Sequence, residues 1–189
     1  MWPYKYASVD IETTGLNPEN CQVIQFGIIL DDLESDIETL PAKCWLVRTD
    51  GDIYQGQPFA LQMNAEILKQ LSVPRKESPY NWCRPVKLVE TVKQWLKQYG
   101  WEGEKLTFAG KNFASFDKPF LMKLGWSKVF QGHRSLDPGS MYWRPSDGGV
   151  VPSTEECAKR AGITLSENRH TAVADALDVV KLIRKAHAN

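Results

Sequence analysis

The stretch YASVDIETTGLNP, residues 6–18, places two carboxylates inside a run that otherwise predicts a buried strand. Side chains on a strand alternate between two faces, so Asp10 and Glu12 point the same way. Like charges at this range repel each other, and burying either one without a partner is expensive. The strand ends in a glycine turn at residues 13–15, where α/β folds often place functional sites. A half-exposed strand with two solvated acids is the alternative interpretation.

The composition is that of an ordinary globular protein. The chain has 189 residues, of which 42% are apolar and 24% are charged, so one domain with a sizeable core is expected. The N-terminus lacks the apolar run of a signal peptide, and no stretch approaches the roughly 20 apolar residues of a membrane helix. We therefore expect a soluble, cytoplasmic protein that does not enter a membrane.

Charge and cysteine content limit the classes of partner and site. The 23 basic and 23 acidic residues give a formal net charge of zero. This balance argues against extensive wrapping of a nucleic-acid backbone, but it allows a grip on a few nucleotides at one end. The four cysteines are widely spaced, without a CxxC pair or a histidine at zinc-site spacing. Reduced thiols are the expected state.

The hydrophobic pattern predicts a mixed α/β domain with helices packed on a sheet. The early strands should be neighbours and antiparallel. Strands are predicted at residues 6–12, 21–31, 43–48 and 105–112, and helices at 58–71, 85–100, 113–125, 153–162 and 171–186, with 138–152 irregular.

Three further candidate residues are weak when they are taken one at a time. Asp117 stands at the start of a predicted helix, where an acid complements the helix dipole. Asp175 lies about 140° from the middle of the apolar stripe of its helix, which is typical of a solvated aspartate such as Asp178. His170 has the sequence context of a loop histidine ahead of a helix. Only the whole set of acids and histidine is informative.

Taken together, three motifs resemble those of the DnaQ-like 3′-to-5′ exonucleases, the DEDDh branch of the ribonuclease H-like superfamily. They are DIETTGL at residues 10–16, NFASFD at 112–117 and HTAVAD at 170–175, in the family order and across nearly the whole chain. The resemblance implies a ribonuclease H-like fold, with a mixed central β-sheet flanked by α-helices. It also implies a single exonuclease domain over residues 1–189, with a helical insertion at about 50–104.

The resemblance gives each acid a role. Phosphodiester hydrolysis of this kind uses two divalent cations, Mg²⁺ or Mn²⁺, which prefer oxygen ligands. By motif position, Asp10 would bridge both cations, Glu12 and Asp175 would complete the first site, and Asp117 would serve the second. His170 would be the general base. A related branch has a tyrosine four residues before the last acid; a threonine stands there in this chain.

The resemblance also implies how a single-stranded DNA or RNA 3′ end is held while nucleoside 5′-monophosphates are released. Contacts to the terminal nucleotide would come from Thr13, Thr14, Gly15 and Leu16, and contacts to the second nucleotide from Asn112, Phe113 and Phe116. Core packing is the alternative role for the two phenylalanines.

Three other functions are alternatives to this exonuclease. A ribonuclease H-type endonuclease predicts its glutamate far downstream, whereas Glu12 lies two residues from Asp10. A non-catalytic module that binds nucleic acid or a partner predicts the loss of an acid or of the histidine, and all five residues are present. An oligoribonuclease that finishes short RNA fragments stays open.

The segment at 50–104 is longer than a minimal member of the family needs. It is a candidate substrate rim or partner surface. No other domain is expected in the chain, so a polymerase or another replication or repair partner would act in trans. The motifs do not set the DNA or RNA preference or the oligomeric state.

Overall fold

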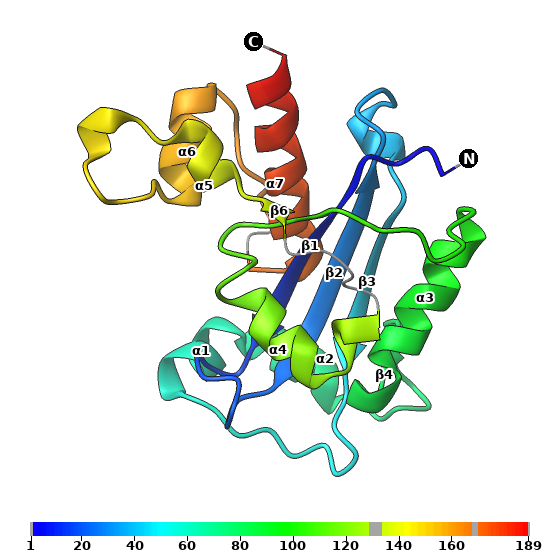
Figure 1. The fold of residues 1–189 in the computed structure, drawn as a ribbon. Helices are drawn as coiled ribbons and strands as arrows, with labels where there is room; N and C mark the ends of the chain where they lie inside the picture. The colour runs from blue at the N-terminus through cyan, green and yellow to red at the C-terminus, as the bar shows by residue number, and fades with distance from the viewer. Residues whose placement is uncertain (1, 129–133, 168–169, 189) are drawn as a thin grey trace.

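A six-stranded mixed sheet forms the centre of the protein in the computed structural model, which describes residues 2–128, 134–167 and 170–188 (Figure 1). The sheet order is β4-β3-β2-β1-β5-β6. The first three strands are antiparallel neighbours, as predicted, and the outer pairings are parallel. The strands are β1 (Tyr6–Thr13), β2 (Val23–Asp31), β3 (Ala42–Val47), β4 (Trp82–Cys83), β5 (Phe108–Ala109) and β6 (Ser135–Leu136).

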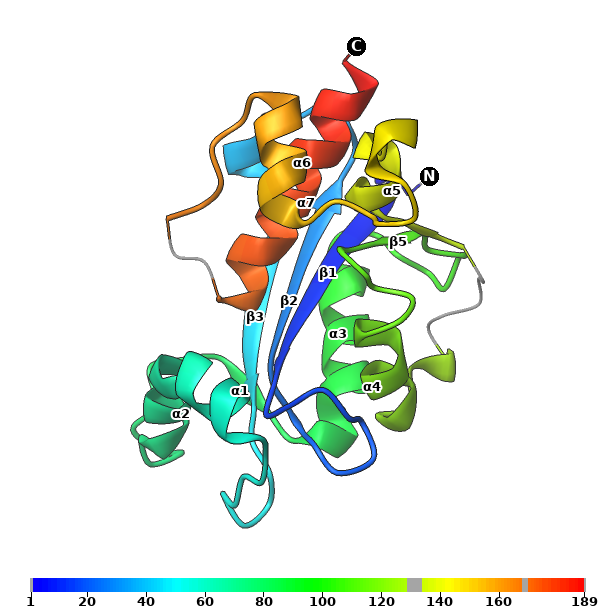
Figure 2. The same ribbon diagram turned by 90° about the vertical axis from the view of Figure 1, so that its left-hand side faces the viewer.

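Helices cover both faces of this sheet, so the predicted fold class is confirmed. α7 lies on one face, α3 and α4 lie on the other, and α1 and α2 lie at one end of the sheet (Figure 2). Among the described residues, no helix has the length and apolarity needed to cross a bilayer. The helices are α1 (Pro58–Met63), α2 (Ala65–Ser72), α3 (Leu88–Gln98), α4 (Asp117–Lys123), α5 (Pro138–Tyr142), α6 (Thr154–Ala161) and α7 (Ala172–His187).

The apolar core is divided between the two faces of the sheet. β2 is buried along its whole length, which matches its nearly continuous apolar sequence. On one face Phe26 packs against Trp45 and Trp126, in the cluster that includes the buried side of α3. On the other face Ile29 packs with Val180 and its neighbours on α7. The two clusters fix β1 and β2 between helical layers.

The alternation along β1 brings its acids to the face that α7 covers. Val9 and Ile11 are buried in the cluster on the α3 side, while Asp10 between them is only partly buried. On the opposite face, the Ser8 hydroxyl donates a 2.8 Å hydrogen bond to the Ala176 carbonyl of α7. The acids of β1 therefore share a face with the helix that carries the last acid.

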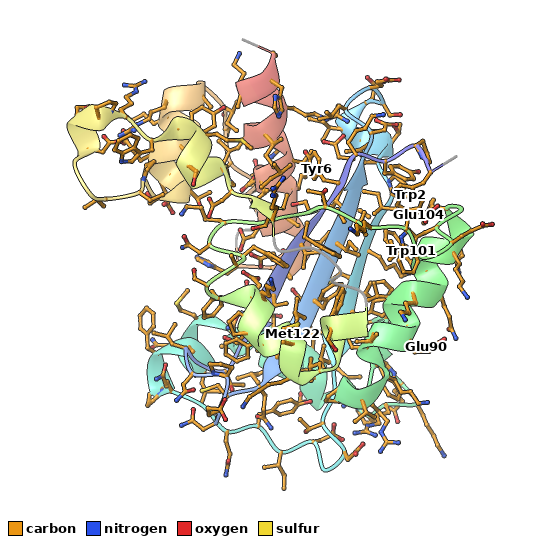
Figure 3. All side chains as sticks on the ribbon, in the orientation of Figure 1. Trp2, Tyr6, Glu90, Trp101, Glu104 and Met122 are labelled. Carbon is orange, nitrogen blue, oxygen red and sulfur yellow. The ribbon has the colours of Figure 1, made fainter. Side chains whose placement is uncertain are left out.

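A buried charge cluster fixes the other end of β1 against α7. Tyr6 lies at the start of β1 (Figure 3). Its hydroxyl donates a 2.5 Å hydrogen bond to the Asp31 carboxylate, which also accepts a 2.6 Å bond from Nη2 of Arg184. Asp31 is fully buried, so this carboxylate has its charge balanced by the guanidinium of α7. α7 is thus tied to the sheet at both ends.

The structure departs from the predicted helix at 58–71. Two helices, α1 and α2, form in its place and meet at Asn64. Asn64 is buried and donates a 3.0 Å hydrogen bond from Nδ2 to the Thr13 carbonyl, a contact that a continuous amphipathic helix would not predict. The predicted apolar face is divided as a result, because Ile67 is buried and Met63 is exposed.

Two other predicted elements differ in length or type. The strand expected at 105–112 is reduced to β5, because only two of its residues pair with β1. The stretch at 138–152, expected to be irregular, contains the short helix α5. Its N-cap is Asp137, whose Oδ1 accepts a 2.7 Å bond from the Gly139 amide. The helix predicted at 153–162 is present as α6, and the Ser153 hydroxyl caps it by accepting a hydrogen bond from the Glu156 amide.

The first turn of α7 lies directly on β2 at Gly27. A Cβ atom added at Gly27 would stand 2.4 Å from the backbone carbon of Ala172. No side chain fits there unless α7 moves away from the sheet. Gly27 therefore sets the distance between β2 and the helix turn that carries Asp175.

We expect Gly27→Ala to destabilise the fold by about 1–3 kcal/mol, because it overpacks a rigid contact between backbones. The melting temperature should fall by about 2–4 °C for each kcal/mol lost. Gly149→Ala is the control, since a Cβ there meets nothing within 4 Å. Equal melting temperatures for the two variants in thermal unfolding would contradict this account of the α7 contact.

Candidate active site

Three of the predicted acids form a compact carboxylate cluster. Asp10, Glu12 and Asp175 each offer one oxygen atom, and these atoms lie within 4.8 Å of one another. The first two lie on one face of β1, and the third lies in the first turn of α7. All three are partly buried, so the cluster is accessible from solvent on one side.

The fourth acid reaches β1 from the other helical layer. β5 pairs with the first part of β1 and ends at Ala109, so the later residues of that edge have no strand partner. Asp117, the first residue of α4, fills this position, and its Oδ1 accepts a 3.1 Å hydrogen bond from the Ile11 amide. Its side chain is 2% exposed. The structure thus brings all four predicted acids to the middle and end of β1.

Burial and mutual repulsion raise the pKa values of this group. Burial is the main cause for Asp10, and the neighbouring carboxylates of Asp117, Glu12 and Asp175 raise its pKa further. Burial, with repulsion from Asp175, raises the pKa of Glu12 to about 7, against a lowering contribution from a hydrogen bond with Asn64. Burial also raises the pKa of Asp117. Without a cation, these acids are held in an environment that disfavours their charge.

The donor set fits a divalent cation of the Mg²⁺ or Mn²⁺ type. Carboxylate oxygens are the ligands that such cations prefer, and the repulsion within the cluster would become attraction to the ion. Asp10 belongs to the cluster with Glu12 and Asp175 and precedes Ile11, whose amide is bonded to Asp117.

His170 lies ahead of α7, where its side chain is exposed and its backbone adopts the left-handed conformation (φ 66°). Residues 168–169, just before it, lie outside the described part of the chain. Asp178 holds the loop that leads to them, because its carboxylate accepts hydrogen bonds from the amide and hydroxyl of Ser166 at 2.9 and 2.8 Å. The prediction of a solvated Asp178 is therefore wrong, since its side chain is 1% exposed.

A pocket of about 550 Å³ opens beside Glu12. One wall consists of the end of β1 and the turn after it, and the other consists of α1 and its flanking residues. Two large apolar side chains are exposed on these walls, Leu16 at 72% and Phe59 at 74%. Of the predicted substrate residues, four line this pocket: Thr13, Gly15, Leu16 and Phe116.

The other three predicted substrate residues lie elsewhere. Thr14 is fully buried, and its hydroxyl accepts a 2.9 Å bond from the Gln22 amide. Phe113 is 3% exposed and stacks on Phe108 at a centroid distance of 5.8 Å, as expected for the alternative role in core packing. Asn112 is exposed in the left-handed conformation. Their contacts with a substrate stay predictions.

The insertion is fastened to the turn that follows β1. The Gln57 amide donates a 2.8 Å hydrogen bond to the Thr14 carbonyl, and the Leu16 amide donates a 3.1 Å bond to Oε1 of Gln57. Gly56 permits this approach, because a Cβ there would stand 2.0 Å from the Thr14 carbonyl oxygen. The two walls of the pocket are therefore joined by hydrogen bonds between the turn and the insertion.

The sequence predicts the insertion as a candidate rim but does not indicate which of its residues line the pocket. Gln57, Phe59 and Asn64 line the pocket, and no motif marks them. The only local signal was an asparagine in the middle of a predicted helix, a residue that often interrupts helices by bonding to nearby backbone.

Comparison with known proteins gives structural matches only. No family model and no curated protein matches the chain. The S. pombe Pop2p structure in its Mg²⁺- and Mn²⁺-bound form matches with a TM-score of 0.66 and 15% identity over 98% of this chain and 84% of that chain. The nuclease domain of 3′hExo, a DEDDh family member bound to rAMP, matches with a TM-score of 0.66 and 13% identity over 99% and 92%.

The chain has the ribonuclease H-like fold of the DEDDh exonucleases. E. coli Exonuclease I in complex with a 5cy-dT13 oligonucleotide is also similar, with a TM-score of 0.66 and 17% identity over 97% of this chain. The chain spans 40% of the length of Exonuclease I and 84% of Pop2p. At these identities the likeness concerns the fold, and the chemistry has to be argued from the site.

The raised pKa of Glu12 predicts how stability depends on pH without metal. The native state keeps this proton up to about pH 7, whereas an unfolded glutamate loses it near pH 4.5. Between these values the native state binds more protons, so the free energy of unfolding falls as pH rises. In chelator, we expect a lower melting temperature at pH 8 than at pH 5.

Excess Mn²⁺ should raise the melting temperature more at pH 8 than at pH 5, because the cation competes with protons for the same oxygens. Asp10→Asn should reduce the pH dependence of the melting temperature and also its rise with Mn²⁺, since the substitution removes one charge from the cluster. A melting temperature that is independent of pH and of Mn²⁺ in differential scanning fluorimetry would contradict the cluster as a cation site.

Proposed function

We propose that this protein is a metal-dependent 3′-to-5′ exonuclease that releases nucleoside 5′-monophosphates from single-stranded nucleic acid. The observation that carries the proposal is the cluster of Asp10, Glu12 and Asp175, with ligand atoms within 4.8 Å, beside a pocket of about 550 Å³. The fold of the DEDDh exonucleases supports it. Residues 1–189 would form one catalytic domain, with the insertion at about 50–104 as part of its substrate wall.

The proposal assigns two divalent cations to the four acids. Asp10 would contact both, Glu12 and Asp175 would complete one site, and Asp117 would serve the other directly or through water. The presence of Mg²⁺ and Mn²⁺ in the similar Pop2p structure supports this choice of metal. When bound, such cations activate water and stabilise the leaving oxygen of a phosphodiester.

His170 would take the proton from the attacking water. An imidazole is suited to this role because it changes charge near neutral pH. Its place five residues before Asp175, and the anchoring of the preceding loop by Asp178 and Ser166, support the assignment.

The pocket would hold the terminal nucleotide. Leu16 and Phe59 offer exposed apolar surface on which a base can stack, and such stacking is tolerant of sequence. The complexes of Exonuclease I with an oligonucleotide and of the 3′hExo nuclease domain with rAMP support nucleotide binding at this fold. The zero net charge agrees with contacts to a few nucleotides only.

A non-catalytic binding module and an oligoribonuclease are the competing functions. The first is disfavoured because all five motif residues are present. The second differs only in substrate length, and comparing a dinucleotide with a 20-mer separates it from the main proposal. A partner acting in trans, such as a polymerase, and a cytoplasmic location stay predictions.

Asp10→Ala should abolish hydrolysis and leave the fold intact, because it removes the ligand shared by both cations. The assay follows a 5′-labelled single-stranded RNA and its DNA counterpart with Mg²⁺, with Mn²⁺ and with excess chelator. The wild type should shorten the labelled oligonucleotide one nucleotide at a time, and only when metal is present. Intact substrate under every condition would refute the proposed exonuclease activity. An active Asp10→Ala protein would refute the assignment of the metal site.

His170→Ala should depress turnover by about 10²–10⁴-fold, the usual contribution of a general base, while Mn²⁺ binding is preserved. The pH dependence of kcat should lose its limb near neutral pH. His187→Ala is the control, because that exposed histidine lies at the far end of α7. A pH–rate profile unchanged by His170→Ala would reject the assignment.

A further inference from the structure

Asn64 is a buried amide that lies at the junction of α1 and α2 and lines the nucleotide pocket. Its side chain is 5% exposed. Its Nδ2 donates a 3.0 Å hydrogen bond to the Thr13 carbonyl, and the amide lowers the pKa of the adjacent Glu12 against the rise that burial causes. The donor end of this amide is therefore used within the protein.

The acceptor atom of the same amide makes no hydrogen bond within the described part of the protein. Oδ1 of Asn64 is buried and has no hydrogen-bond partner among the described residues. Buried polar atoms are almost always paired, so an orphaned acceptor in the wall of a pocket calls for a donor from a ligand. The oxygen is covered in the unliganded structure, so this contact requires the pocket wall to rearrange when a ligand binds.

Glu12 supplies a second acceptor in the same wall. Its carboxylate offers one oxygen to the cation cluster, and a carboxylate has lone pairs for further hydrogen bonds. Glu12 and Asn64 line the same pocket, and Asn64 is bonded to the carbonyl of Thr13, the residue after Glu12, so these acceptors are neighbours. A ligand that satisfies both must present two neighbouring donors.

The 3′-terminal sugars of RNA and DNA differ in the number of hydroxyl donors that they present. A terminal ribose carries a 2′,3′-diol with two hydroxyl donors on adjacent carbons, whereas a terminal deoxyribose carries one. With DNA, the sugar would supply a hydrogen bond to only one of these two acceptors, Glu12 or Asn64. Rejection of analogues that leave a buried polar group unpaired is a strong source of specificity.

We propose that Asn64 reads the terminal sugar, by accepting a hydrogen bond from the 2′,3′-diol beside Glu12, and so gives this protein a preference for RNA 3′ ends. The inference rests on the proposed exonuclease and names its substrate class. Asn64 acts as a specificity residue: it contacts the sugar and does not take part in bond cleavage.

The test compares two RNA oligonucleotides that differ only at the 3′-terminal nucleotide, ribose in one and 2′-deoxyribose in the other. For the wild type, we expect kcat/KM to be about tenfold higher for the ribose end, as one hydrogen bond to a buried acceptor provides. Asn64→Ala should bring the ratio close to one. Gln62→Ala is the matched control, an exposed amide on α1 that does not line the pocket, and should keep the wild-type ratio.

The ratio is internal to each variant, so a general loss of activity does not obscure it. If Asn64→Ala slows both substrates equally and keeps the ratio, Asn64 is only structural and the inference fails. A second measurement needs no variant: calorimetric binding of AMP and 2′-deoxy-AMP with Mn²⁺ should favour AMP by a similar factor, and equal affinities overturn the inference.

The outcomes separate the two proposals. Hydrolysis of both ends at equal rates by the wild type refutes the sugar preference and leaves the exonuclease standing. Hydrolysis of neither oligonucleotide with Mg²⁺ or Mn²⁺ refutes the exonuclease, and the sugar preference falls with it.

Discussion

Repulsion among four carboxylates around β1 is the constraint on which the rest of this structure depends. Burial and mutual repulsion raise the pKa values of Asp10, Glu12 and Asp117, so the fold must hold these groups together against their own charge. Both helical layers take part. α7 lies on the sheet at Gly27 and brings Asp175 to the cluster, while Asp117 caps the amide of Ile11. A divalent cation bound to this cluster would convert the repulsion into attraction.

The insertion between β3 and β5 turns the acidic cluster into a site with a shaped pocket. Its segment at 55–57 is bonded to the turn after β1, and Asn64 connects its two helices to Thr13, the residue after Glu12. The contacts that fix the pocket wall therefore adjoin the proposed cation ligand Glu12. In the proposed exonuclease, substrate recognition and metal binding would be coupled through one short stretch of main chain, residues 12–16.

Local patterns in the sequence predicted much of the fold and the identity of the acids. The antiparallel strands, α7 and the shared face of Asp10 and Glu12 follow from periodicity, and the motifs supplied Asp117 and Asp175. What sequence could not predict depends on long-range contacts. The break at Asn64 reflects a bond to Thr13, 51 positions earlier, and the burial of Asp178 reflects its bonds to Ser166, 12 positions earlier. Thr13 and Ser166 both lie outside the helices whose periodicity was used for the prediction.

The measurement that tests the central claim most directly is anomalous diffraction from crystals soaked in Mn²⁺ near neutral pH. The account predicts a strong manganese peak bounded by Asp10, Glu12 and Asp175, and a second peak on the side of Asp10 that faces Asp117. Both peaks should be absent from crystals of Asp10→Asn. A wild-type crystal that holds no manganese at these carboxylates, at Mn²⁺ concentrations in the millimolar range, would contradict the account.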